Sequence, residues 1–150
     1  MGKSRAAEIL AKRGAKVSDS DQLARELVEP GQPALAEIVE VFGDGVLRED
    51  GWLDRAKVGE LVFGDSAARE KLEGILHPRI RDVRQARFDG WAAAGEWLAV
   101  AVIPLLFETR AEASFDRIVC VACSPEAQRE RLRERGWSDD QISSRLEAQM

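Results

Sequence analysis

Gly2-Lys3-Ser4 has the residue types that end a phosphate-binding loop of the form G-x-x-x-x-G-K-[ST]. In such a loop, backbone N–H groups surround the phosphates, the lysine reaches the outer phosphates, and the hydroxyl binds Mg²⁺. The apolar residues of 4–13 recur with helical spacing, so the helix that should follow the loop is predicted. The tripeptide also arises by chance at solvated chain ends, so by itself it leaves both interpretations open.

Asp19 and Asp21 are the next residues that could do chemistry, because they follow a short strand expected over residues 15–18. In an open α/β sheet, ligands bind at the carboxyl ends of the strands, where these carboxylates would lie. Alternatively, Ser20 or Asp21 caps the helix expected over residues 23–28. The two roles are compatible, and the sequence favours neither.

Residues 22–94 are predicted to be almost entirely helical, since apolar residues at helical spacing alternate with stop signals and no strand pattern occurs. We expect Asp54 to cap one helix and Asp65 or Ser66 to cap the next. A break is expected at His77-Pro78, with Pro78 as the first residue of a further helix to about residue 94.

Two continuous apolar runs, residues 97–103 and 117–122, are typical of strands buried on both faces of a parallel sheet. Within the second run, Cys120 is expected to pack as a small apolar side chain. Ser124-Pro125-Glu126 predicts a helix start, and Ser138 with Gln141 fits a capping box for the last helix. This order of elements predicts an α/β fold with a parallel sheet and a helical subdomain.

Composition narrows the class of function. Of the 150 residues, 45% are hydrophobic and 33% charged, which is enough for one globular core. The net charge of −5 argues against a nucleic-acid partner. The sequence has no run of 18 or more apolar residues and no apolar signal region, so no membrane partner and a cytoplasmic location are expected. With one histidine and two cysteines, a metal cluster of these residue types is not expected.

A series of short motifs in one order makes the chain resemble the dephospho-coenzyme A (dephospho-CoA) kinase family over essentially all 150 residues. These motifs are Gly2-Lys3-Ser4, Asp19-x-Asp21 with Leu23-Ala24-Arg25, Val28-Glu29-Pro30-Gly31, Asp50-Gly51-x-Leu53-Asp54-Arg55, Val62-Phe63, Leu72-Glu73-x-Ile75-Leu76-His77-Pro78-x-Ile80, Ile103-Pro104-Leu105-Leu106-Phe107-Glu108 and Ser124-Pro125-Glu126. The resemblance implies a P-loop kinase core over residues 1–21 and 95–128. It also implies a helical coenzyme A-binding subdomain over 22–94 and part of a helical lid over 129–150.

The family's reaction is the ATP-dependent phosphorylation of the ribose 3′-hydroxyl of dephospho-CoA, the last step of coenzyme A biosynthesis. The resemblance therefore implies ATP and Mg²⁺ as cofactors. The implied catalytic residues are the base Asp21, with Lys3 and the lid arginine Arg135. The implied nucleotide contacts are Gly2, Lys3, Ser4 and Arg131, of which Ser4 also binds Mg²⁺. The implied acceptor contacts are Asp19, Arg25, His77, Arg81 and Glu108.

Several of these roles have structural alternatives. The arginines could simply lie on a solvated helix surface, His77 could serve the helix break, and Glu108 could be structural. The family pattern also has a strand and a glycine-rich loop before Gly2 and further segments after Met150. The resemblance thus implies a shortened or degenerate kinase with weak or absent turnover. Another small-molecule P-loop kinase and a non-catalytic coenzyme-binding remnant remain open.

Overall fold

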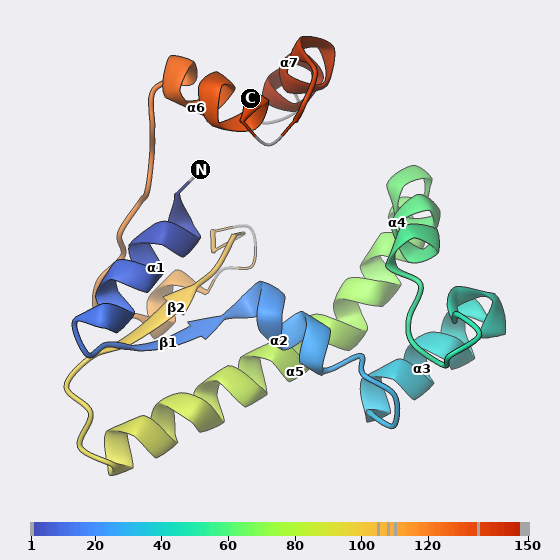
Figure 1. Cartoon of the computed structure of the whole chain (residues 1–150). Coiled ribbons are helices and arrows are strands. Elements are labelled where there is room, and N and C mark those ends of the chain that lie inside the picture. Colours follow the sequence, from blue (N-terminus) through green and yellow to red (C-terminus); the bar gives the residue numbers. More distant parts are fainter. Residues whose placement is uncertain (1, 105, 108, 110, 135, 148–150) are drawn as a thin grey trace.

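The computed structural model describes residues 2–104, 106, 107, 109, 111–134 and 136–147. The sheet that the structure describes has two strands. Figure 1 shows it near one end of the molecule, with a helical block that extends away from it and the last helices of the chain beyond the start of α1 (Lys3–Lys12). Among the described residues, no helix is both long and apolar enough to cross a bilayer.

The sheet consists of β1 (Lys16–Asp19) and β2 (Ala99–Val102), which pair in parallel from Lys16 opposite Ala99 to Asp19 opposite Val102. Both strands were predicted from the sequence, and their parallel pairing confirms that prediction. Parallel neighbours require a long crossover connection, which here is the whole helical segment between them. Helices α1 (Lys3–Lys12) and α5 (Ser66–Ala93) contact both strands, and Figure 1 shows them on opposite sides of the sheet.

The helical block contains α2 (Ser20–Glu26), α3 (Pro33–Phe42), the 3₁₀ turn η1 (Asp44–Val46), α4 (Arg55–Gly64) and α5. Its core is a cluster of buried side chains that comprises Val28, Ala34, Ile38, Val46, Val58 and Ile75. These residues come from several elements, so the block has an apolar core of its own beside the sheet.

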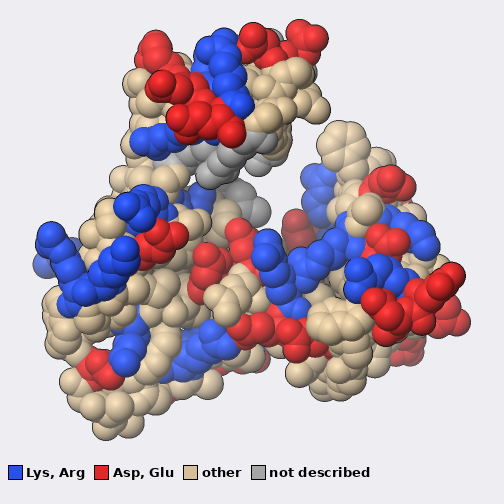
Figure 2. All heavy atoms as spheres, in the orientation of Figure 1, with Lys and Arg blue, Asp and Glu red and all other residues tan. Residues whose placement is uncertain are grey.

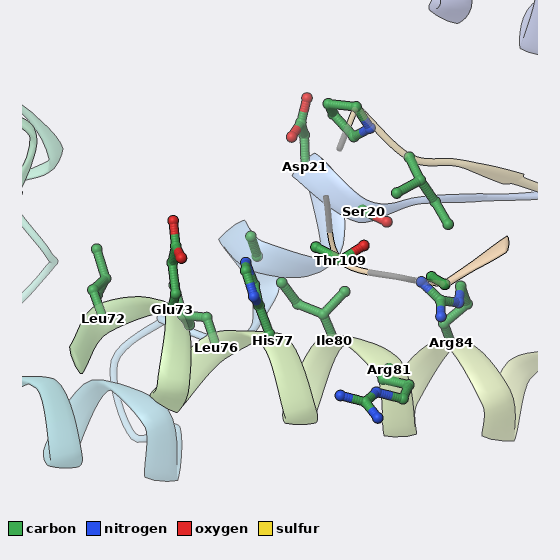
Figure 3. Close-up of a pocket in the computed structure, with 14 residues that line it drawn as sticks. Ser20, Asp21, Leu72, Glu73, Leu76, His77, Ile80, Arg81, Arg84 and Thr109 are labelled. Atoms are coloured by element: carbon green, nitrogen blue, oxygen red, sulfur yellow. The ribbon is translucent and has the colours of Figure 1, made fainter. Parts of the chain in front are cut away.

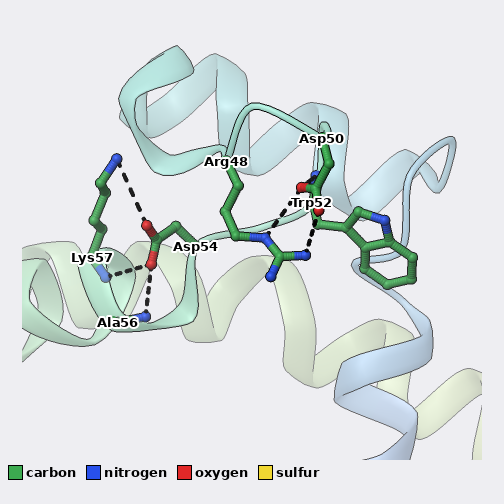
Figure 4. Close-up of polar contacts among 6 residues, drawn as sticks. All are labelled: Arg48, Asp50, Trp52, Asp54, Ala56 and Lys57. Carbon is green, nitrogen blue, oxygen red and sulfur yellow. Dashed lines mark hydrogen bonds and ion pairs between the residues drawn. The ribbon is translucent and has the colours of Figure 1, made fainter.

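Side-chain caps set where the helices of the block begin. Asp54 accepts hydrogen bonds from the N–H groups of Ala56 and Lys57 and so caps α4, and Figure 4 shows this cap beside the Arg48–Asp50 ion pair of the preceding loop. Asp65 caps α5 in the same way. The cap at Asp54 was predicted, and Asp65 was one of the two residues expected to cap the next helix, because an aspartate before an apolar-periodic segment satisfies N–H groups that the helix leaves free.

The predicted helix break at His77-Pro78 is wrong. Helix α5 continues through Pro78 as a single helix of 28 residues. Proline removes one hydrogen bond of the helix and crowds the carbonyl of the preceding turn. Here the Arg79 guanidinium donates to the carbonyl of Ile75 at 2.7 Å, within the same turn, and Ile75 itself is buried in the core. The carbonyl that Pro78 leaves without its helical donor is that of Gly74, so this bond to Ile75 does not replace the lost one, and tertiary packing at Ile75 offsets the local preference of Pro78.

The predicted strand over residues 117–122 is also wrong, since this segment has no regular secondary structure. A strand needs a neighbour for its ladder hydrogen bonds, and β1 and β2 pair with each other without it. Val119 is 80% exposed, and Cys120, which was expected to be packed, is exposed as well. An apolar run predicts burial only where the fold supplies a surface to cover it.

The helix starts predicted at Ser124 and Ser138 are confirmed. After the short turn η2 (Glu112–Ser114), Ser124 Oγ accepts from the Ala127 N–H and caps α6 (Pro125–Arg133). Ser138 and Gln141 exchange hydrogen bonds at the start of α7 (Asp139–Glu147), which confirms the predicted capping box. Helices α6 and α7 contact each other, and each has a buried apolar side chain, Leu132 in α6 and Ile142 in α7.

Replacing Ile38 by alanine tests the core of the helical block. Ile38 is fully buried, so Ile38→Ala should lower the free energy of unfolding by about 2–5 kcal/mol, measured by urea denaturation. Val41→Ala, on the same helix but 43% exposed, is the matched control and should change stability by no more than about 0.5 kcal/mol. Equal losses for both variants would contradict a core centred on Ile38.

Candidate active site

A cavity of about 330 Å³ lies where the carboxyl end of the sheet meets α2 and α5 (Figure 3). Three of the residues named from the sequence, Asp21, His77 and Arg81, line it together. Its other lining residues are mainly apolar: Ala24, Leu72, Leu76, Ile80, Ile103, Pro104 and Ala111, with the polar Ser20, Glu73, Arg84 and Thr109. An apolar cavity with a few convergent polar groups is the usual form of a small-molecule site.

Asp19 and Asp21 have different surroundings although they are one residue apart. Asp19 ends β1 and caps α2, because its Oδ1 accepts from the N–H groups of Asp21 at 2.8 Å and Gln22 at 3.4 Å. The expected capping by Ser20 or Asp21 is therefore wrong. Capping requires extended backbone at the capping residue, and Asp19 still has the extended conformation of the strand.

Asp21 lies in the first turn of α2, exposed and at the edge of the cavity. No described residue forms a hydrogen bond or ion pair with its carboxylate. Figure 3 shows this carboxylate directed away from α5, which leaves it accessible from outside the cavity. Beside it, the buried Ser20 Oγ has no hydrogen-bond partner within the described part of the chain. The start of α2 thus has an accessible carboxylate, that of Asp21, next to the Ser20 hydroxyl, which lacks a hydrogen-bond partner among the described residues.

Helix α5 contributes one wall of the cavity through residues on successive turns. Glu73 and His77 are four residues apart, as are Ile80 and Arg84, and positions with this spacing lie on one face of a helix. This alignment depends on the helix continuing through Pro78. If the helix had ended there, His77 and Arg84 would not belong to the same continuous wall.

Arg84 was not singled out from the sequence. It is only 8% exposed, and its guanidinium lies 5.5 Å from the centre of the Phe115 ring, within cation–π range. Burial, and secondarily the nearby Arg81 guanidinium, lower the pKa of Arg84. The sequence did contain a sign of this position, because the spacing of Arg84 from His77 and Ile80 places the three on one face of α5. Arginines on helices are usually solvated, so the spacing alone did not indicate burial.

The start of α1 has the features of an anion site. Gly2 caps the helix with a φ of 113° and no side-chain hydrogen bond, and no acidic residue occupies the first turn. The helix N–H groups and dipole therefore remain available to an anion, beside the exposed Lys3 and Ser4. A Cβ built on Gly2 would lie 4.0 Å from Arg131 Nη1, so α6 brings a second cation to this end of α1.

The remaining candidates are more dispersed. Arg25 is exposed on α2, one turn after Asp21, and does not line the cavity; it is the secondary cause, after burial, of the lowered pKa of Arg55. Glu108 and Arg135 lie outside the described residues. Among the residues that are described, no group of three or more His, Cys, Asp or Glu side chains could hold a metal ion.

Comparison with known proteins decides the family. The model of the family described as Dephospho-CoA kinase matches residues 1–150. The chain belongs to the dephospho-CoA kinase family. It is 47% identical to a dephospho-CoA kinase from Anaeromyxobacter dehalogenans over 150 residues, which are 99% of this chain and 71% of that protein. It is 43% identical to one from Bdellovibrio bacteriovorus over 149 residues, 99% of this chain and 74% of that protein.

Solved structures agree with this assignment. A Thermus thermophilus crystal structure matches with a TM-score of 0.82 at 32% identity, covering 99% of this chain and 74% of the other. A dephospho-CoA kinase from Campylobacter jejuni matches with a TM-score of 0.67 at 25% identity and the same coverage. The α/β P-loop kinase fold predicted from the motifs is thereby confirmed. As a member of this family, the chain is a kinase with ATP as a substrate.

The capping role of Asp19 can be separated from its charge. Asp19→Ala removes the acceptor for two N–H groups of α2 and should lower the free energy of unfolding by about 1 kcal/mol. Asp19→Asn keeps a side-chain oxygen that caps equally well and should stay within a few tenths of a kcal/mol, roughly, of the parent. Urea denaturation measures both. An alanine variant as stable as the asparagine variant would exclude a significant cap at Asp19.

Proposed function

We propose that this chain transfers the γ-phosphoryl group of ATP to the ribose 3′-hydroxyl of dephospho-CoA, which forms coenzyme A and ADP. The observation that supports this most directly is the Asp21 carboxylate at the edge of a mainly apolar cavity, where no described residue pairs with it. Phosphoryl transfer depends on positioning and on charge neutralisation more than on covalent chemistry, so a site of this kind is sufficient for the acceptor side.

Asp21 is the proposed general base. As the acceptor oxygen forms its bond to the γ-phosphorus, the proton of the 3′-hydroxyl passes to the Asp21 carboxylate. The bond between the γ-phosphorus and the bridging oxygen breaks, and ADP leaves with that electron pair. Because Asp19 takes the capping role, Asp21 has both carboxylate oxygens available for this proton. A base must lie within hydrogen-bond reach of the proton that it accepts, and the exposure of Asp21 permits this.

The proposed phosphate-binding groups of the donor nucleotide are Gly2, Lys3, Ser4 and Arg131. The free N–H groups at the start of α1, the Lys3 ammonium and the Arg131 guanidinium would neutralise the charge of the β- and γ-phosphates. Arg135, implied by the family resemblance, is proposed as the lid arginine for the transferring group. On the face drawn in Figure 2, acidic and basic side chains are interspersed, which favours such local phosphate recognition over binding of a long polyanion.

Mg²⁺ fits this site if ATP supplies most of its ligands. Ser4 offers a hydroxyl at the exposed start of α1, and Mg²⁺ commonly combines one or two protein oxygens with phosphate oxygens and water. The scarcity of clustered carboxylates in the described chain agrees with that mode. When bound, the ion would reduce the negative charge of the phosphates, while Lys3 and Arg131 orient them.

The proposed acceptor contacts are His77 and Arg81 in the cavity wall, with Asp19, Arg25 and Glu108 near its edges. In this proposal, residues 22–94 form the coenzyme-binding subdomain, residues 1–21 and 95–128 the kinase core, and residues from 129 onward part of the lid. A different small-molecule acceptor is the second candidate, favoured only by the modest size of the cavity. Competition between dephospho-CoA and nucleosides for the same enzyme would separate the two.

Removing the Lys3 ammonium should abolish most of the activity. With Mg-ATP and dephospho-CoA, the chain should release ADP slowly or not at all, in line with the weak or absent turnover that the family resemblance implies. Lys3→Ala should lower any acceptor-dependent rate by about 10²–10³-fold, as expected for a lost contact to developing charge. Lys12→Ala, an exposed lysine at the other end of α1, is the matched control and should keep the parent rate. ADP release that does not depend on dephospho-CoA, or acceptor-dependent release that Lys3→Ala leaves unchanged, would contradict the proposal.

Replacing Asp21 by asparagine tests the base. Asp21→Asn keeps the shape of the side chain but cannot accept the proton, so kcat should fall by about 10²–10⁴-fold with little change in KM. The free energy of unfolding should stay close to that of the parent, because the carboxylate has no partner among the described residues. Asp82→Asn, an exposed position on α5 outside the cavity, is the control. An active Asp21→Asn variant would remove Asp21 from the mechanism.

A further inference from the structure

Arg84 is a buried cation that has no acidic partner among the described residues. Its side chain lines the cavity, its exposed fraction is 8%, and Figure 3 shows its guanidinium on the side of α5 that faces Ser20 and Thr109. A guanidinium has five N–H donors and no acceptor. Within the described part of the chain, none of these donors makes a hydrogen bond or ion pair, and the guanidinium lies 5.5 Å from the centre of the Phe115 ring.

The neighbouring arginines of α5 show that this is unusual for the helix. Arg79 pairs with Glu37, Arg87 pairs with Glu26, and Arg69 donates to the carbonyl of Val62. Burial, and secondarily the Arg81 guanidinium three residues earlier, lower the pKa of Arg84. Two arginines that line one cavity, one of them buried, form an environment that an anion would stabilise.

The proposed acceptor has an anion at a suitable place in its structure. Dephospho-CoA carries its 5′-diphosphate on the same ribose whose 3′-hydroxyl would meet Asp21. A diphosphate presents several oxygens, enough to satisfy the planar donors of a buried arginine. The donor nucleotide is a poorer match, because Gly2, Lys3 and Ser4 do not line this cavity.

We propose that Arg84 binds the 5′-diphosphate of the acceptor substrate, with the more exposed Arg81 as a second contact. This assignment rests on the proposed function and extends it to a residue that the motifs did not indicate. It makes Arg84 a determinant of acceptor specificity, since acceptors without a phosphate at this position would leave its donors unpaired. Arg84 binds and orients the acceptor and takes no part in proton transfer.

If Arg84 serves to bind a ligand, replacing it should weaken ligand binding without lowering the stability of the unliganded protein. Arg84→Met removes the desolvated charge while keeping an unbranched side chain that can contact the Phe115 ring. The melting temperature of the unliganded variant should therefore equal or exceed that of the parent. Its dissociation constant for dephospho-CoA, measured by calorimetry, should rise by at least about tenfold, as expected for a lost charge-assisted contact.

Three ligands make this test specific. Arg84→Met should leave the dissociation constant for Mg-ATP unchanged. It should also leave that of adenosine unchanged, because adenosine has the ribose 3′-hydroxyl but no phosphate. In turnover, KM for dephospho-CoA should rise while kcat changes little. Arg87→Met is the matched control, since it removes an arginine of the same helix that pairs with Glu26 outside the cavity, and it should bind dephospho-CoA as the parent does.

The outcomes separate this inference from the function on which it rests. If the parent binds dephospho-CoA and Arg84→Met binds it equally well, the role of Arg84 is overturned while the proposed function stands. An equal loss of affinity for all three ligands would also overturn it, as would a lower melting temperature with unchanged affinity. Should the methionine variant fail to fold, Arg84→Lys decides: it keeps the charge but not the planar donors, and parent-like affinity would overturn the assignment. A parent that binds no dephospho-CoA overturns both proposals.

Discussion

The parallel pairing of β1 with β2 is the constraint on which the rest of the structure depends. Two strands that run side by side in the same direction cannot be joined by a tight turn, so the chain must return along the sheet before the second strand begins. Helix α5 makes that return beneath both strands. The carboxyl ends of β1 and β2, which lead to Asp21 and to Ile103, therefore open over the same helix, and the cavity forms where the three elements meet.

Capping at the end of β1 separates two chemically equivalent carboxylates. Whichever aspartate is the last extended residue must satisfy the free N–H groups of α2, and that residue is Asp19. Asp21 then falls within the helix, where its side chain projects outward and is not required to accept hydrogen bonds from backbone N–H groups. A site that requires one unengaged carboxylate can thus arise from local helix geometry, without any special arrangement of distant residues. The same logic explains why Asp19 and Asp21 are not interchangeable.

Local signals made most of the fold predictable, and the failures occurred where a distant contact decides the outcome. Asp54, Asp65, Ser124 and Ser138 act within one helical turn, so their capping roles could be inferred from the sequence. Pro78 is locally unfavourable in a helix, but α5 continues through it, with Ile75 of the preceding turn buried in the core. Residues 117–122 have strand composition, yet a strand exists only with a partner. In the site, Asp21 and His77 stood out through motifs, whereas the importance of Arg84 depends on burial.

Several positions that break the usual rules of folding lie at the cavity or next to residues that line it. Pro78 lies inside α5 next to His77, and among the described residues Arg84 has no acidic partner and the buried Ser20 Oγ has no hydrogen bond. The buried Ser18 Oγ and Glu112 Oε2 also lack a partner there, and these residues precede Asp19 and follow Ala111 in the chain. Each feature costs stability. The core around Ile38 lies among α3, α4 and the first half of α5, and its packing follows ordinary rules. Arg84 and Ser20 line the cavity whereas the core around Ile38 is regular, and this is the distribution expected when ligand binding rather than folding determines those two residues.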